Sequence, residues 1–161
     1  MRLTKFTDYS IRALVYLSLQ QERLATIAEI AKVYDISENH MTKVVHQLGL
    51  GGFIQTVRGK GGGMRLARTP EKINIGKVIR FTENQTGFLP CTTRKSDCCI
   101  QSACNLVEVL REAQVALFSI FDKYTLADLL HQREKKLASI LLPERGTRTK
   151  KPVKKTVKKA A

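Results

Sequence analysis

The chain has 161 residues, with 28 Lys and Arg against 14 Asp and Glu, which gives a net charge of +14. This length suffices for one small domain with a buried core, with or without an appended element. No segment reaches the ~18 apolar residues of a membrane-spanning helix, and Asp8 and Arg12 interrupt any run typical of a signal peptide. We therefore expect a cytoplasmic protein whose cysteines stay reduced.

The positive charge lies in the two ends of the chain. Residues 1–80 hold 13 Lys and Arg against 6 Asp and Glu, residues 81–143 hold 7 of each, and residues 144–161 hold 8 against 1. Such basic segments favour nucleic acid as the partner. An anionic membrane surface is the alternative, but no basic amphipathic helix with aromatic anchors supports it. The tail, 144–161, lacks periodicity and is predicted to be disordered.

The first fifty residues carry the pattern of three helices. Apolar side chains recur at helical spacing over 7–20, with Thr7 as the expected N-cap. Thr26 and Glu29 match a capping box that begins a second, short helix. Ser37 is the expected N-cap of a third helix, with the inward stripe Met41, Val44, Val45 and Leu48 and an end at Gly49, Gly51 and Gly52.

A β-hairpin is expected next. Two strand-like runs, 53–57 and 64–67, flank a basic, glycine-rich connection, and another helix follows at about 75–83. Helix, turn, helix and hairpin is the order of a winged helix-turn-helix. The fold class is therefore mainly α with a small β-hairpin wing, and residues 1–83 are the predicted DNA-binding head.

The third helix and the hairpin tip carry side chains suited to DNA. Asparagine pairs with adenine, lysine and arginine pair with guanine, and a basic tip approaches phosphate. The candidate DNA-binding residues are Ser37, Asn39, His40 and Lys43 on the helix and Arg58, Lys60 and Arg65 on the hairpin. Ordinary solvated faces are the alternative reading. A nucleotide phosphate loop is a poorer match, because the Gly-Lys-Ser/Thr ending is missing.

All the cysteines lie close together, at Cys91, Cys98, Cys99 and Cys104, in and at the end of a predicted loop, 84–103. One cysteine alone is usually a small buried apolar residue, but four thiols in a polar loop favour metal ligation. Closed zinc sites prefer Cys-x-x-Cys pairs, which are missing here, and the looser spacing suits an iron–sulfur cluster. Adjacent Cys98 and Cys99 are poorly placed to ligate together, so a fourth ligand must come from elsewhere.

Two more helices are expected in 104–143. A long one runs from Cys104 to about Lys123, with the apolar stripe Leu106, Val109, Leu110, Ala113, Leu117, Ile120 and Phe121. Thr125 caps a last helix that ends before Pro143. The three histidines are scattered and no nucleophile or general base accompanies them, so we expect no enzyme.

Four segments resemble a known family, the iron–sulfur winged-helix regulators of the IscR and NsrR type. They are the opening MRLTKFTDYSIRAL, the hairpin VRGKGGGMRL, the cysteine loop, and YTLADL, and together they span residues 1–142. The resemblance implies an intertwined homodimer with a long dimerisation helix. It also implies a cluster held by Cys91, Cys98 and Cys104, with Cys99 as an alternative and Asp8 of the partner subunit as the fourth ligand.

Within this family the NsrR branch matches better than the IscR branch. IscR-like members use a histidine three residues after the last cysteine, where this chain has Val107. Asp8 also has an alternative explanation that needs no metal, because an acidic side chain in the first turn of a helix is stabilised by the helix dipole. The extra thiol of Cys99 departs from the family pattern.

The resemblance implies a repressor that binds a two-fold-related operator while it carries its cluster, with [4Fe–4S] favoured over [2Fe–2S]. Nitric oxide would nitrosylate the cluster, release the DNA and derepress genes for nitric oxide detoxification. Alternatives are a same-fold regulator that senses iron or redox status, a small iron–sulfur electron carrier, and a zinc-stabilised repressor without sensing.

Overall fold

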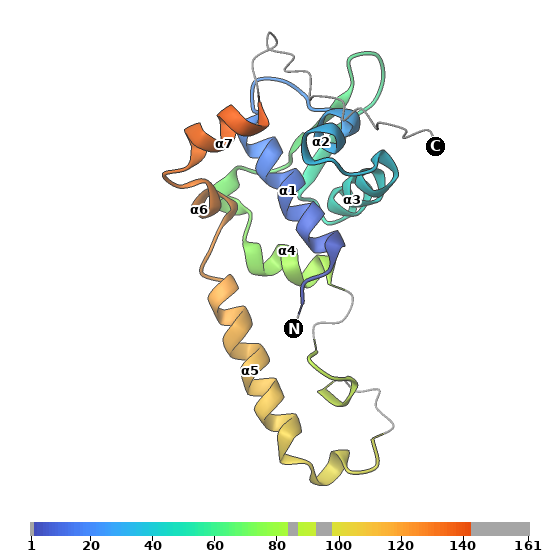
Figure 1. The fold of residues 1–161 in the computed structure, drawn as a ribbon, viewed down its shortest axis with the longest axis vertical. Helices are drawn as coiled ribbons and strands as arrows, with labels where there is room; N and C mark the ends of the chain where they lie inside the picture. The colour runs from blue at the N-terminus through green and yellow to red at the C-terminus, as the bar shows by residue number, and fades with distance from the viewer. Residues whose placement is uncertain (1, 84–86, 93–97, 143–161) are drawn as a thin grey trace, which may run out of the picture.

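The computed structural model describes residues 2–83, 87–92 and 98–142 (Figure 1). The elements are α1 (Lys5–Leu19), α2 (Ile27–Tyr34), α3 (Glu38–Leu50), β1 (Ile54–Val57), β2 (Gly63–Leu66), α4 (Ile75–Thr82), α5 (Asn105–Phe121), α6 (Leu126–Leu130) and α7 (Glu134–Leu141), with 3-10 turns at Pro70–Lys72, Pro90–Thr92 and Gln101–Ala103. The predicted class, mainly α with one antiparallel hairpin, is confirmed. The basic tail lies outside the described residues. No helix among the described residues combines the length and apolar character needed to cross a bilayer.

The start of α1 differs from the prediction. Thr4 caps the helix, because its hydroxyl accepts a hydrogen bond from the Thr7 amide at 3.2 Å. Thr7 is fully buried one turn later, and its hydroxyl bonds to Thr82 and Glu83 at the end of α4. The predicted cap at Thr7 is therefore wrong, since a contact distant in sequence occupies the hydroxyl that the local pattern assigned to capping.

The helix-turn-helix forms as predicted. Thr26 and Glu29 make a reciprocal capping box at α2, with amide-to-side-chain distances of 2.9 and 3.2 Å. Ser37 caps α3 by accepting from the His40 amide at 3.3 Å. The helix continues to Leu50, so Gly49 lies inside it and only the later glycines follow its end.

The hairpin forms the wing and is tied to the head. Gln55 pairs with Arg65 and Thr56 with Met64 in the antiparallel register. Met64 is buried, and its backbone exchanges two hydrogen bonds with Ala25, at 3.0 and 2.8 Å, just before α2. The wing is therefore anchored at β2, while its glycine-rich end projects from the head.

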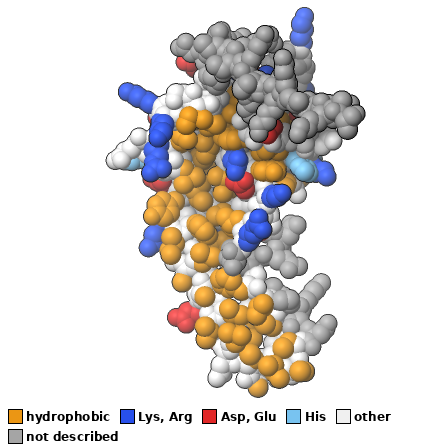
Figure 2. Space-filling view, viewed as in Figure 1, with side chains coloured by type: hydrophobic (Ala, Val, Ile, Leu, Met, Phe, Trp, Pro, Cys, Tyr) orange, Lys and Arg blue, Asp and Glu red, His pale blue; other side chains and the backbone are white. Residues whose placement is uncertain are grey.

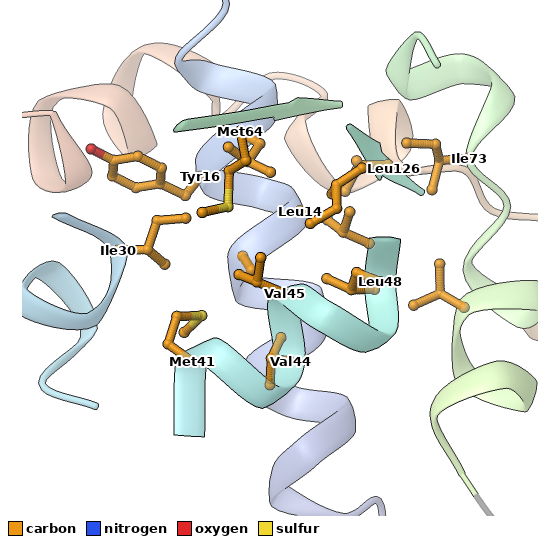
Figure 3. Close-up of a cluster of buried hydrophobic side chains, with 14 of the residues drawn as sticks. Leu14, Tyr16, Ile30, Met41, Val44, Val45, Leu48, Met64, Ile73 and Leu126 are labelled. Atoms are coloured by element: carbon orange, nitrogen blue, oxygen red, sulfur yellow. The ribbon is translucent and has the colours of Figure 1, made fainter. Parts of the chain in front are cut away.

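One core joins the elements of the head (Figure 3). Leu14 and Leu17 of α1 are almost completely buried at its centre, and the predicted stripe of α3 packs against them. Leu126 of α6 and Leu141 of α7 belong to the same core. The chain therefore leaves the head after α4 and returns to it after α5.

The single last helix predicted from Thr125 to Pro143 is wrong, because this stretch forms two helices. Thr125 caps α6 through a capping box with Asp128, as expected for a helix start. Gln132 then adopts a φ of 61°, which breaks the helical path before α7. Neither glycine nor proline marks this break in the sequence. The turn lets α7 fold back so that Leu141 reaches the core.

α5 extends away from the head, and the cysteine segment, residues 84–104, of which 87–92 and 98–104 are described, leads into its far end (Figure 1). Its bounds lie within two residues of the prediction. Phe118, near the head, is buried, whereas Leu106, Val109 and Ile120 of the predicted stripe are 50%, 58% and 52% exposed. Figure 2 shows apolar side chains gathered over this part of the surface.

Candidate nucleic-acid interface and cysteine segment

The recognition helix, α3, has one buried apolar face, which packs on the head, and one exposed polar face, which is available to DNA. Its stripe of Met41, Val44, Val45 and Leu48 is at most 5% exposed, so the helix is fixed against α1 and α2. The predicted DNA-binding residues of the helix, Ser37, Asn39, His40 and Lys43, are all exposed. The structure therefore places these four side chains together on the solvent side of the first half of α3, where base edges and phosphates are reached in helix-turn-helix proteins.

The wing presents Arg58 and Lys60 at its tip and Arg65 on its side, and all three are exposed. Gly59 and Gly61 have φ of 105° and 78°, a region that residues with a Cβ rarely adopt. These two glycines therefore let the chain reverse direction, and the Gly62 amide donates to the Gly59 carbonyl at 2.9 Å. The tip of the wing combines exposed basic side chains with glycines whose backbone can approach a surface closely.

Gln55 is a site residue that sequence reasoning missed. Its side-chain carbonyl oxygen accepts two hydrogen bonds from the Arg65 guanidinium, at 3.2 and 3.1 Å. Gln55 thereby holds Arg65 across the strand pair, whereas Arg58 and Lys60 lie at the tip. The signal that could have found it is the hairpin register, since directly opposed side chains interact in antiparallel pairs.

Asp8 lies on the outer face of α1 and is 48% exposed. Arg12, one turn later, pairs with its carboxylate at 2.9 Å, and this hydrogen bond raises the pKa of Arg12. An exposed i,i+4 pair stabilises a helix by only about 0.3–0.5 kcal/mol. The Asp8 carboxylate is therefore accessible to a stronger partner.

Two residues near Asp8 on α1 contact the two helices of the helix-turn-helix. Arg12 lies over the Tyr34 ring of α2 at 5.7 Å, and burial raises the pKa of Tyr34 to about 12, so its phenol is neutral. Tyr9, next to Asp8, lies 6.4 Å from His40 at the start of α3, measured between ring centroids. A change at Asp8 is thus one residue removed from a contact with the recognition helix.

Two of the cysteines line an open groove at the far end of α5. Cys91 and Cys104 are half-buried and Cys98 and Cys99 are exposed, and none of the four forms a disulfide. Gln101 ties the segment together, because its side chain donates to the Cys91 carbonyl and its amide to the Cys98 carbonyl, both at 3.1 Å. The groove measures about 580 Å³ and is lined partly by Cys98, Cys104, Glu108 and Arg111.

The thiols are of the kind that holds an iron–sulfur cluster, but the described residues of one chain do not gather a complete ligand set. Thiolates are the usual ligands of iron–sulfur clusters, and two of these thiols line one open groove. No group of three or more His, Cys, Asp or Glu side chains able to hold a metal occurs among the described residues. The described part of one chain therefore does not bring Asp8 and the cysteines together.

A polar joint connects α4 to the end of α5. The Arg80 guanidinium donates to both carboxylate oxygens of Asp122, at 2.7 and 2.6 Å, and lies over the Phe118 ring at 4.4 Å. This hydrogen bonding lowers the pKa of Asp122. Asn74, the N-cap of α4, donates to the backbone carbonyl of Asp122 at 2.7 Å. The orientation of α5 is thereby fixed relative to the head.

These features define a DNA-binding transcriptional regulator: a recognition helix with an exposed polar face, a basic wing, and a helix-turn-helix packed into the core of the head. The family model Rrf2, described as "Iron-dependent Transcriptional regulator", matches residues 3–132. The chain belongs to the Rrf2 family, and within it to the NsrR type.

Curated relatives carry the name "HTH-type transcriptional regulator NsrR". The Bacillus subtilis protein is 45% identical over 83% of this chain and 93% of its own length. The Shouchella clausii protein is 46% identical over 81% of this chain and 89% of its own length. These relatives are regulators, which agrees with the expectation that the chain is not an enzyme.

Solved structures share the fold. IscR of T. potens superposes with a TM-score of 0.65 at 26% identity, covering 84% of this chain and 90% of that chain. The cysteine regulator CymR of B. subtilis superposes with a TM-score of 0.62 at 22% identity, over 80% of this chain and 95% of its own. The winged-helix class predicted from the sequence is therefore confirmed.

Proposed function

We propose that this protein is a homodimeric, cluster-dependent repressor that leaves its operator when nitric oxide is present. The observation that carries the proposal is the separation of the candidate ligands within the described part of the chain. Cysteines gather at the far end of α5, while a half-exposed carboxylate, Asp8, lies on the head beside the recognition helix. The relatives named NsrR support the same reading.

The dimer interface is the exposed stripe of α5. Three of its apolar side chains are at least 50% exposed, and burying such side chains is the main favourable contribution to association. Pairing two α5 helices gives the repressor the two-fold symmetry that a two-fold-related operator requires.

Cys91, Cys98 and Cys104 are the proposed thiolate ligands, with Cys99 as the alternative to its neighbour. Asp8 of the partner subunit is the fourth ligand of a [4Fe–4S] cluster, or of a [2Fe–2S] cluster. When bound, the cluster supplies iron that reacts with nitric oxide. Asp8 transmits the result, because its carboxylate turns from the partner's site to Arg12 when ligation is lost, and Tyr9 beside it contacts His40.

Ligation by Asp8 thus fixes the pose of α1 and the reading helix in the DNA-bound dimer. A coupling of about 1–3 kcal/mol between two sites changes affinity roughly 5–150-fold. Asn39, His40 and Lys43 with Ser37 read the major groove, and Arg58, Lys60 and Arg65 bind phosphate or the minor groove. A protein that binds operator DNA in this way acts in the cytoplasm. The basic tail, 144–161, adds affinity that is independent of sequence and weakened by salt.

The Asp8→Ala variant tests the proposal. We expect anaerobically purified wild-type protein to be brown and to lose operator affinity on nitric oxide titration. The variant should bind the operator more weakly than wild type and should respond less to nitric oxide. Glu22→Ala, which removes one negative charge beyond the other end of α1, is the control. An Asp8→Ala protein with the wild-type spectrum, affinity and response would rule out this mechanism.

A second candidate function is the sensing of iron or redox status by the same fold. It is favoured by the description of the matching family as iron-dependent. Iron depletion that releases the operator while nitric oxide does not would select it. Colourless protein that binds zinc would contradict both candidates.

A further inference from the structure

Glu83, the C-cap residue that follows α4 and precedes the cysteine segment, reaches back to the start of α1. Its Oε1 atom accepts hydrogen bonds from the Thr4 amide at 2.8 Å and from the Thr4 hydroxyl at 3.1 Å. The same atom accepts a third hydrogen bond, from the Thr7 hydroxyl, at 2.6 Å. One carboxylate thus holds the cap and the first turn of the helix that carries Asp8.

The protons of this cluster have only one consistent arrangement around the carboxylate. At neutral pH a glutamate carboxylate only accepts hydrogen bonds, so the Thr4 and Thr7 hydroxyls both donate to it. The Thr7 oxygen lies 2.8 Å from the Thr82 hydroxyl, and Thr7 and Thr82 are 0% and 5% exposed. A buried hydroxyl that loses its partner is costly, because no water replaces it. Glu83 therefore accepts three of the hydrogen bonds that hold the start of α1, and without it the Thr7 hydroxyl would have to turn to the hydroxyl of Thr82.

The position of Glu83 in the chain connects these hydrogen bonds to the candidate cluster ligands. Thr7, which it holds, directly precedes Asp8, and the segment that leads from Glu83 carries Cys91. We propose that Glu83 is a positioning residue that fixes the first turn of α1, and with it Asp8, relative to the cysteine segment. This proposal rests on the proposed function for the role of Asp8 as a ligand. In the proposed dimer, the cysteines of a chain ligate its own cluster and its Asp8 ligates the cluster of the partner subunit. Glu83 would connect these two sets of ligands within one chain.

The first test needs no cluster. In cluster-free Glu83→Ala protein, hydrogen exchange at the amides of residues 5–9 should quicken by about tenfold, as expected when charge-assisted hydrogen bonds are lost. Amides of α3 should exchange as in wild type. Glu83→Gln keeps a carbonyl oxygen at the same place and should restore slow exchange. Glu22→Ala is the charge-matched control.

The second test separates positioning from general stability. With the cluster loaded, Glu83→Ala should shorten cluster lifetime under anaerobic chelation by about tenfold, the lower end of the loss typical of residues that orient metal ligands. In an Asp8→Ala background the same substitution should have no further effect. Thr7→Val, which removes two hydrogen bonds and keeps the buried shape, should reproduce the result if Glu83→Ala folds poorly.

Several outcomes would overturn the proposal. These are wild-type exchange at residues 5–9 in both Glu83→Ala and Thr7→Val, equal losses in Glu83→Gln and Glu83→Ala, or an effect that adds fully to that of Asp8→Ala. A changed absorption spectrum in Glu83→Ala with an unchanged one in Asp8→Ala would make Glu83 itself a ligand. If Asp8→Ala leaves the cluster unaffected, the proposed function fails. The hydrogen-exchange measurement then still tests whether Glu83 stabilises the first turn of α1.

Discussion

α3 and α5 are both amphipathic helices, but the structure covers the apolar stripe of only one of them. The stripe of α3 is at most 5% exposed, whereas Leu106, Val109 and Ile120 of α5 are at least 50% exposed. The first stripe packs on α1 within the same chain. The comparison shows that apolar periodicity predicts a face to be buried and leaves open which chain buries it.

The two regions also differ in what holds them. The head has a continuous core, capped helices and a wing anchored by backbone hydrogen bonds. α5 is attached to it through Phe118 and the Arg80–Asp122 joint near one end. We therefore expect substitutions in α5 to affect assembly, and substitutions on the outer face of the head to affect DNA binding with assembly intact.

The largest effect is expected from a charge in the exposed stripe. Val109→Glu would bury an unpaired carboxylate in the proposed dimer interface, which costs about 3–5 kcal/mol, or more than about 100-fold in dimer dissociation constant. Sedimentation equilibrium should show monomers at concentrations where wild type is dimeric, and operator affinity should fall with it.

Val115→Glu is the matched control for this substitution. Val115 is 70% exposed, more than the 58% of Val109, but it lies on the opposite side of α5 from the stripe. We expect it to remain dimeric. Dissociation by both variants to the same degree would refute the assignment of the stripe as the interface.

The second prediction concerns the head alone. Asn39→Ala or Lys43→Ala should reduce the free energy of operator binding by about 1–3 kcal/mol and relax base preference. Lys60→Ala should weaken binding to all DNA sequences alike and reduce the slope of log affinity against log salt concentration by about one. Competition binding across operator variants at several salt concentrations measures both. None of the three should alter sedimentation. Equal effects of the helix and wing substitutions on base preference would contradict the division of roles.

Local patterns predicted the parts of this protein whose causes are local. The capping box at Thr26, the cap at Ser37 and the presence of a hairpin with a glycine-rich connection all depend on residues within about one turn or one strand pair. The buried role of Thr7, the hold of Glu83 on Thr4 and the break at Gln132 depend on contacts or backbone geometry that no nearby residue marks. The candidate site shows the same division, because the exposed side chains of α3 follow from the period of that helix, whereas Gln55 is defined by its partner across the hairpin.

The third prediction tests the joint between the two regions. A side chain at Gly76 would collide with the Asp122 carboxylate, so Gly76→Ala should displace the pair with Arg80. Overpacking of this kind typically destabilises by about 1–3 kcal/mol. Gly49→Ala in α3, where an added Cβ meets nothing within 4 Å, should instead stabilise the helix by about 0.5–1 kcal/mol. Urea unfolding measures both, and a stabilising Gly76→Ala would show that the joint is loose.

The smallest effect is the dependence of this joint on pH. The hydrogen bond from Arg80 lowers the pKa of Asp122 below its ordinary 3.8. A lowered pKa means that the folded chain favours the ionised carboxylate. The resulting stabilisation is present above the unfolded pKa and is lost as the pH falls through the lower folded pKa. Asp122→Asn removes the titrating group, so wild type should exceed the variant in urea stability near neutral pH, with a gap that closes below about pH 4. The lowered pKa values of Glu29 and Asp128 act in both proteins and cancel from the difference. A gap that widens on acidification would mean that Arg80 and Asp122 do not pair in solution, and α5 would then be held to the head by Phe118, by the hydrogen bond from the Asn74 side chain to the Asp122 carbonyl and by the backbone.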